Sequence, residues 1–268
     1  MPTAQEFLTD KNKSTLLLCA NFGEGKTSIG ITFPKFYYIG FRQGGLEVIR
    51  QAKNDKYKTN LIMYEELCPK SNDDLKDMFQ PDKGRIHTKV REATKLAMKG
   101  EVETLFIDDG TDAVENVQKY IWEFDKKVGQ NGLDTQGMYG QLKINLSNWI
   151  DRDVLPFRKY GNVIFTTHLM RESDQTMEGT KTRAGAVDKM SNLYPDIVGS
   201  FRREIQRKFE NVLYLETKLV QGGKKYVAYT SKQVALGTVI LAKNCLGLEP
   251  VIENVSYDTL FKNQPKEK

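Results

Sequence analysis

Residues 16–27 read LLLCANFGEGKT, in which four apolar residues lead directly into a loop that contains two glycines. The loop matches the phosphate-binding P-loop pattern, with Ala20 where the pattern has its first glycine. Gly23 and Gly25 allow the backbone to curl so that successive N–H groups point at phosphate oxygens. A buried strand followed by this loop and a helix predicts a nucleotide-binding α/β fold.

Two side chains of the loop carry the expected chemistry. Lys26 is expected to reach the β- and γ-phosphates, and the hydroxyl of Thr27 is expected to coordinate Mg²⁺. The cofactors are therefore predicted to be ATP and Mg²⁺. A glycine turn with an incidental lysine is the alternative, which the preceding strand disfavours. The predicted nucleotide-binding residues are Asn21, Phe22, Gly23, Glu24, Gly25, Lys26, Thr27 and Ser28.

Further short apolar runs follow along the chain. Their apolarity is continuous rather than alternating, which is typical of strands buried on both faces of a parallel sheet between helices. Helical spacing of apolar residues predicts helices over 112–128, with Asp112 as a possible N-cap, and over 141–157, closed by Pro156. The apolar runs lie at 36–39 (FYYI), 61–64 (LIMY), 104–107 (TLFI) and 163–167 (VIFTT).

The last third of the chain has a different pattern. Residues 211–220 and 226–233 flank the turn sequence GGKK, which predicts an antiparallel β-hairpin. Residues between 169 and about 195 are expected to lack regular structure, and 200–209 (SFRREIQRKF) to form an amphipathic helix. We predict one domain over 1–268, with a core at about 10–210, a hairpin extension at about 211–261 and a polar tail at 262–268.

Composition limits the class of protein. The chain has 268 residues, and 40 Lys and Arg against 35 Asp and Glu give a net charge of +5, which permits an anionic partner without requiring one. Three scattered cysteines favour neither a disulfide framework nor a zinc site. No apolar run approaches the length of a membrane span, so a cytoplasmic location without a membrane partner is expected.

A second apolar strand ends in acid at residues 104–109, TLFIDD. This is the Walker B arrangement, in which the carboxylate of Asp108 holds Mg²⁺ directly or through water. Asp109 has three possible roles: an acid behind the metal ligands, a group that polarises the attacking water, or a carboxylate at a helix N-terminus.

With these residues in place, the chain resembles the RecA-like P-loop ATPases, and most closely the phage nucleotide-binding AAA family, which includes RecA-like single-strand annealing proteins. The resemblance implies an α/β RecA-like core, a mostly parallel sheet between helices, with a C-terminal antiparallel hairpin. It implies a DNA-dependent ATPase that acts on single-stranded DNA in phage-type recombination or replication. A homo-oligomer, a single-strand-binding protein as partner and the cytoplasm of a bacterial host follow from the same resemblance.

The resemblance also gives roles to residues beyond the P-loop. His168 takes the place of the γ-phosphate sensor, with Thr166 and Thr167 beside it; the alternative is a histidine that caps a strand end. Lys243 takes the place of a cation that reaches the nucleotide of the adjacent subunit, or is an ordinary exposed lysine. The loop after His168 contains the candidate DNA contacts, or is simply solvated: Arg171, Lys181, Arg183 and Lys189.

The chain departs from the RecA-like pattern at residues 39–45, IGFRQGG, where the usual catalytic glutamate is absent. Gln43 is a candidate for positioning the attacking water, and Asp109 or a glutamate at 47, 65 or 66 is an alternative base. The predicted catalytic set is Lys26, Gln43, Asp108, Asp109 and His168. Two other functions stay open: a nucleotide-gated binding module with negligible hydrolysis, and a nucleotide kinase with an arginine-rich lid at Arg202-Arg203 and Arg207-Lys208.

Overall fold

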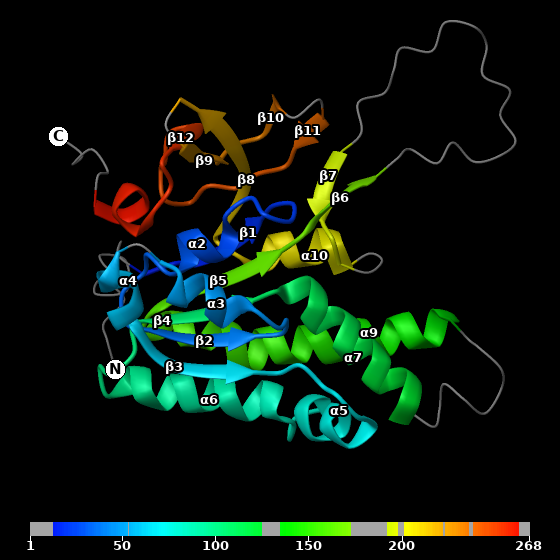
Figure 1. Cartoon of the computed structure of the whole chain (residues 1–268). Helices are drawn as coiled ribbons and strands as arrows, with labels where there is room; N and C mark the ends of the chain where they lie inside the picture. The colour runs from blue at the N-terminus through cyan, green and yellow to red at the C-terminus, as the bar shows by residue number, and fades with distance from the viewer. Residues whose placement is uncertain are drawn as a thin grey trace, which may run out of the picture.

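The computed structural model describes residues 13–52, 54–124, 135–172, 192–197, 201–221, 223–235 and 238–262. Among these residues, eight strands form one sheet in the order β12-β9-β8-β1-β5-β4-β2-β3 (Figure 1). In chain order these strands are β1 Thr15–Cys19, β2 Phe36–Gly40, β3 Leu61–Glu66, β4 Thr104–Asp108, β5 Asn162–Thr167, β8 Asn211–Val220, β9 Gly223–Tyr229 and β12 Val251–Glu253.

The centre of the sheet is parallel. β1 pairs in parallel with both β5 and β8, and β4 pairs in parallel with β5 and β2. Along β1, Leu16 and Leu18 belong to the core on one face of the sheet, whereas Leu17 and Cys19 belong to the core on the other face. Both faces are therefore buried, which confirms the predicted mostly parallel sheet between helices.

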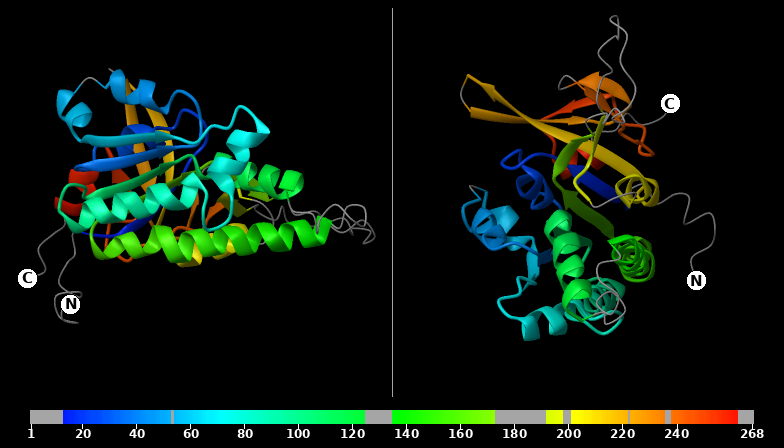
Figure 2. Two further views of the ribbon diagram at one scale, coloured as in Figure 1. Left: turned by 90° about the horizontal axis from the view of Figure 1, so that it is seen from below. Right: turned by 90° about the vertical axis from the view of Figure 1, so that its right-hand side faces the viewer.

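Helices cover the two faces of the sheet (Figures 1 and 2). One layer consists of α5 Asn72–Phe79, α6 Arg85–Met98, α7 Gly110–Phe124, α9 Thr135–Trp149 and α10 Phe201–Lys208. The other layer consists of α2 Lys26–Gly30, α3 Gly45–Arg50, α4 Asp55–Thr59 and the turn Asp258–Lys262. Across the parts of the chain that the structure describes, each helix is too short or too polar to cross a bilayer.

Several predicted boundaries differ from the structure. The run at 61–64 is not buried on both faces, because β3 is the edge strand and exposes Ile62 and Met63. Asp112 is not an N-cap but lies inside α7, which begins at Gly110. Pro156 does not close its helix: α9 continues through a π-helical turn, Ile150–Val154, and a 3-10 turn, Leu155–Lys159. Proline fits at the start of that 3-10 turn, where its missing N–H costs little.

The segment after β5 contains strands where irregular structure was predicted. β6 Leu169–Glu172 and β7 Asn192–Pro195 pair antiparallel, and β7 pairs in parallel with β11 Thr238–Ile240. β10 Gln233–Ala235 completes this smaller sheet. Each strand has only three or four residues, too few for a period-2 pattern to be recognised in the sequence.

The predicted C-terminal hairpin is present as β8 and β9, which pair antiparallel from Tyr214 to Val220. The first half of β8 is also a core strand, because Leu16–Cys19 of β1 pair with Asn211–Tyr214. The hairpin is therefore continuous with the parallel sheet. The division of the chain into a core and an extension at about residue 210 stays a prediction.

Candidate nucleotide-binding site

The P-loop begins where β1 ends. The N–H of Ala20 donates to the carbonyl of Thr167 at 3.1 Å, which fixes the start of the loop against β5. Gly23 and Gly25 have φ angles of 77° and 85°, values that glycine adopts without strain. A carboxylate oxygen of Glu24 accepts the N–H of Asn21 at 2.7 Å and closes the loop. The loop is thus held in the left-handed turns that a phosphate-binding backbone requires.

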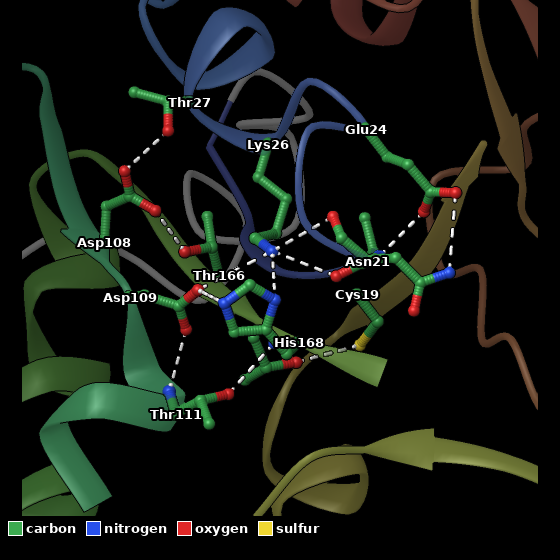
Figure 3. Close-up of polar contacts among 12 residues, drawn as sticks. Cys19, Asn21, Glu24, Lys26, Thr27, Asp108, Asp109, Thr111, Thr166 and His168 are labelled. Atoms are coloured by element: carbon green, nitrogen blue, oxygen red, sulfur yellow. Dashed lines mark hydrogen bonds and ion pairs between the residues drawn. The ribbon is translucent and has the colours of Figure 1, made fainter. Parts of the chain in front are cut away.

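Lys26 points back across the loop (Figure 3). Its Nζ donates to the carbonyl of Ala20 at 2.9 Å and to Nδ1 of His168 at 3.0 Å, and lies 3.6 Å from Oδ2 of Asp109. The side chain is buried. A buried ammonium requires such partners, because losing water without replacement hydrogen bonds is costly. The P-loop lysine therefore lies between β1, β4 and β5 at the carboxyl ends of these strands.

Asp108 is the last residue of β4 and accepts three hydroxyl groups. Thr27 donates to Oδ2 at 2.7 Å, Tyr38 donates to Oδ2 at 2.9 Å, and Thr166 donates to Oδ1 at 2.5 Å. These donors come from α2, β2 and β5. The carboxylate is consequently oriented by three separate elements.

The donor set at Asp108 and Thr27 fits Mg²⁺. Mg²⁺ prefers oxygen ligands and is usually held by one or two carboxylates together with substrate phosphates and water. Within the described part of the chain, no group of three or more His, Cys, Asp or Glu side chains forms a metal site. One carboxylate beside one hydroxyl suits an ion that takes its remaining ligands from nucleotide phosphates and water.

Asp109 takes one of the roles that its position allowed, that of a carboxylate at a helix N-terminus. Its Oδ1 accepts the N–H of Thr111 at 2.8 Å at the start of α7, and its Oδ2 lies 3.0 Å from Nε2 of His168. The pKa of Asp109 is raised to about 6, chiefly by burial; the charge of Lys26 opposes this rise, and the nearby Asp108 adds to it. A carboxyl group with a pKa near the working pH is suited to accept a proton.

His168 follows β5 and has partners at its main-chain N–H and at both ring nitrogens. Its main-chain N–H donates to Oγ1 of Thr111 at 2.9 Å. Burial, and then the charge of Lys26, lowers the pKa of His168, so the ring is neutral at pH 7. Because an ammonium group only donates, Nδ1 accepts from Lys26 and the ring proton lies on Nε2, directed at Asp109. Lys26, His168 and Asp109 thus form a closed triangle of contacts.

A pocket of about 460 Å³ surrounds these residues, within the range of small-molecule sites. Phe22, with 77 % of its surface exposed, lies at its mouth, and the guanidinium carbon of Arg42 lies 5.1 Å from its ring centroid. The residues that line the pocket are Asn21, Phe22, Gly23, Glu24, Gly25, Lys26, Thr27, Ser28, Tyr38, Arg42, Gln43, Gly44, Gly45, Val48, Asp108, Asp109, His168, Lys224 and Tyr226.

Four residues with polar side chains in the pocket were missed by the sequence analysis as site residues. Tyr38 and Arg42 come from β2 and the loop after it, and Lys224 and Tyr226 come from β9. The alternation of side chains along a strand places Lys224 and Tyr226 on the same face of β9. The alternation of side chains could be recognised in the sequence. What that face of β9 contacts depends, however, on the position of β8 beside β1.

The other predicted residues have separate positions. Gln43 lines the pocket, whereas Glu65 is paired with Arg85 and Lys89 on α6. Arg171 is exposed on β6. Nζ of Lys243 donates to the carbonyl of Phe209 in the same chain at 2.7 Å. The other two expected bases, Glu47 and Glu66, lie outside the pocket lining. The other predicted DNA contacts lie outside the described residues: Lys181, Arg183 and Lys189.

Comparisons with known proteins give one family. No curated protein matches the chain. Among solved structures, the chain is similar to the flagellar accessory protein FlaH from Methanocaldococcus jannaschii, with 11 % identity, a TM-score of 0.44 and coverage of 94 % of this chain and 92 % of that one. The family model described as an AAA domain matches residues 12–238. That range contains the P-loop, Asp108, Asp109 and His168, and the chain therefore belongs to the AAA domain family of P-loop ATPases.

Proposed function

We propose that the protein is a Mg²⁺-dependent ATPase whose turnover depends on single-stranded DNA. The observation that carries the proposal is the convergence of Lys26, Thr27, Asp108, Asp109 and His168 in one pocket, at the carboxyl ends of β1, β4 and β5. The AAA domain family supports nucleotide binding and hydrolysis as the activity class. The DNA dependence is a finer proposal that the resemblance to RecA-like proteins motivates.

Each side chain has a role in this proposal. The P-loop N–H groups and Lys26 bind the phosphate chain, while Thr27 and Asp108 hold Mg²⁺, which neutralises charge on the phosphates when bound. Asp109 accepts the proton of the attacking water, because its pKa of about 6 leaves it mostly ionised at pH 7. Gln43 lies in the loop after β2, lines the same pocket and orients that water.

His168 connects the nucleotide to the segment that follows it. Its carbonyl accepts the N–H of Asp196, next to β7, at 2.8 Å, and β6 begins at the next residue. A change in the partners of the ring therefore acts at the start of β6, which bears the exposed Arg171. Basic side chains on this segment are suited to bind a phosphate backbone without reading sequence.

The proposal includes an assembly on DNA. ATP binding favours a homo-oligomer on single-stranded DNA, and hydrolysis weakens it by removing the γ-phosphate contact to His168. Annealing or a related step in recombination or replication of a phage type, together with a single-strand-binding protein, is the proposed setting. The position of Lys243, bonded to its own chain, gives no support to an in-trans role for that lysine.

A nucleotide-gated binding module without turnover is the second candidate. One specific observation favours it: the acidic residues that line the described pocket are Glu24, Asp108 and Asp109, and no glutamate of the pocket comes from β2 or the loop after it. The kinase alternative has less support, because Arg202 lines a different pocket, with Thr111 and Asp196, rather than the P-loop pocket.

The test is steady-state phosphate release from ATP, titrated with single-stranded DNA. Lys26→Ala serves as the blank, and Lys232→Ala, an exposed lysine, as the matched control. We expect DNA to stimulate turnover in the wild type and the control but not in Lys26→Ala. Turnover equal to that of the blank despite measurable ATP binding supports the binding module. Transfer of phosphate to a nucleoside monophosphate supports the kinase.

A further inference from the structure

The hairpin of β8 and β9 extends past the strand that carries the P-loop. β8 runs parallel to β1, and the last pair between them joins Cys19 and Tyr214. β1 ends there, but β8 continues through Leu215–Val220, roughly 20 Å of further strand at the usual rise per residue. Since the P-loop follows Cys19 directly, the hairpin must lie alongside the loop (Figure 2, right).

One side of the hairpin contacts the P-loop. The hydroxyl of Tyr226 lies 3.5 Å from Oγ of Ser28. A Cβ atom added to Gly25 would lie 2.3 Å from Cε1 of Tyr226, so the tyrosine ring is packed directly against the loop backbone. β12 pairs with the other edge of β9 and fixes it in place. The hairpin is therefore built into one wall of the nucleotide pocket.

Lys224 and Lys225 are adjacent, but they lie on opposite faces of β9. Lys224 shares the face of Tyr226 and lines the pocket, whereas the ammonium of Lys225 is paired with Glu253 of β12. Within the described residues, the ammonium of Lys224 forms no hydrogen bond or ion pair. One lysine thus has its charge satisfied by the fold, and the other presents its charge to the pocket.

We infer that Lys224 binds the phosphate chain of the nucleotide held by the P-loop of the same chain. This inference rests on the proposed ATP binding. The cations of the pocket are then Lys26, Arg42 and Lys224, contributed by three separate segments. A lysine on a flexible stem suits this role, because it provides a compact point charge that needs no fixed bidentate geometry.

This further cation comes from the same chain as the P-loop. Such a charge comes in trans from a neighbouring subunit or in cis from the same chain, and the hairpin provides it in cis. Binding of nucleotide and the position of the hairpin are consequently coupled within a single chain. A ligand that moves the tip of the hairpin changes the nucleotide affinity by the same factor as the nucleotide changes the affinity for that ligand.

The test is equilibrium binding of Mg²⁺-ATP, Mg²⁺-ADP and AMP, measured by calorimetry at two salt concentrations. Lys224→Ala is compared with Lys225→Ala, its neighbour on the opposite face, and with Lys26→Ala. We expect Lys224→Ala to raise the Kd for ATP about tenfold, the loss of one charge-assisted hydrogen bond. The Kd for AMP should change less than twofold, and Lys225→Ala should bind like the wild type.

The outcomes separate the two proposals. If the wild type binds ATP, Lys26→Ala does not, and Lys224→Ala binds like Lys225→Ala, the role of Lys224 is wrong and ATP binding stands. If the wild type and Lys26→Ala bind ATP equally weakly, the proposed ATP binding itself is wrong. An equal loss for ATP and AMP overturns the assignment to the phosphate chain beyond the α-phosphate.

A mixing experiment tests whether Lys224 acts within its own chain. Lys26→Ala subunits retain Lys224, and Lys224→Ala subunits retain the P-loop lysine. If Lys224 acts in trans, a mixture of the two variants recovers tight binding at mixed interfaces. We expect no recovery, and recovery would overturn the same-chain assignment.

Discussion

The Nζ atom of Lys26 lies 3.0 Å from Nδ1 of His168, although the two residues are 142 positions apart in the sequence. The P-loop lysine and the candidate γ-phosphate sensor are therefore direct partners. A phosphate group that binds Lys26 competes with His168 for the same ammonium. When Lys26 donates to a phosphate instead, Nδ1 of His168 loses its hydrogen-bond donor, and the contact between the ring and Asp109 changes as well. This exchange of partners leads to the first prediction.

Replacing His168 with alanine should leave ATP binding nearly intact but remove the stimulation of turnover by DNA. We expect His168→Ala to bind ATP within about threefold of the wild type, because Lys26 keeps its bond to the carbonyl of Ala20. Stimulation of turnover by single-stranded DNA should fall at least tenfold, because the link from the nucleotide to β6 is lost. Phosphate release with and without DNA measures both effects, and full stimulation in the variant would refute the sensor role.

Asp109 is the candidate base, and Glu47 on α3 is the alternative that the sequence left open. We expect Asp109→Asn to lower kcat about 100-fold, within the usual range for a general base, with little change in ATP affinity. The matched control is Glu47→Gln, which removes a carboxylate that contacts Gln51 and Arg50. The wild-type kcat should fall as the pH drops below about 6, where Asp109 becomes protonated. A larger loss in Glu47→Gln would reverse the assignment.

The buried carboxylate of Asp109 should also lower the free energy of unfolding at neutral pH. Its pKa is raised from 3.8 to about 6 on folding, so between these values the folded protein binds more protons than the unfolded chain. The contribution of Asp109 to the free energy of unfolding therefore falls as the pH rises through this window. We expect Asp109→Asn to gain stability relative to the wild type between pH 4 and pH 7, by at most about 3 kcal/mol. Denaturant unfolding of both proteins at three pH values tests this, and a difference that is independent of pH would contradict it.

Gly25 serves both the backbone and the hairpin. Gly25→Ala places a Cβ against Tyr226 and imposes a left-handed φ of 85° on alanine, whereas Gly23→Ala imposes a similar φ with no atom within 4 Å. A left-handed φ alone costs an alanine about 1–2 kcal/mol. We expect a larger loss of ATP affinity in Gly25→Ala than in Gly23→Ala, and partial recovery in Gly25→Ala with Tyr226→Ala. Equal losses in the two single variants would show that the ring contact is unimportant.

Tyr38 orients Asp108, and its removal should show in the Mg²⁺ dependence. Tyr38→Phe deletes the 2.9 Å bond to Oδ2 but keeps the ring that packs on Tyr64 and Phe106. We expect the half-saturating Mg²⁺ concentration for turnover to rise about tenfold, as for other groups that orient a metal ligand. Tyr64→Phe, which loses a hydroxyl bonded to Glu66, is the control. No change in Mg²⁺ dependence for Tyr38→Phe would refute this role.

The local part of the site was predictable from the sequence, because its chemistry lies in contiguous residues. The P-loop needs one strand, one turn and one helix start, all within residues 15–30, and Asp108 needs only the end of an apolar strand. The continuous apolarity of the core strands was sufficient for the parallel sheet as well. These features depend on periodicity and on glycine, which act over a few residues.

The contacts between distant segments were not predictable in the same way. Whether Lys224 meets the P-loop depends on the pairing of β8 with β1, and whether Tyr38 reaches Asp108 depends on β2 lying beside β4. Strand order is set by the packing of the whole molecule, and a single sequence carries no local signal for it. The strands β6 and β7 were missed for another reason: a strand of four residues offers too few alternations to stand out.

The position of β1 has a consequence for how the protein is made. Both neighbours of this strand, β5 and β8, are formed by residues beyond 160, so β1 leaves the ribosome long before either of its partner strands. Contacts between residues so far apart in the sequence close slowly. ATP therefore cannot assist the early folding of a nascent chain, because the strands that hold its binding loop in place, β5 and β8, are synthesised long after that loop.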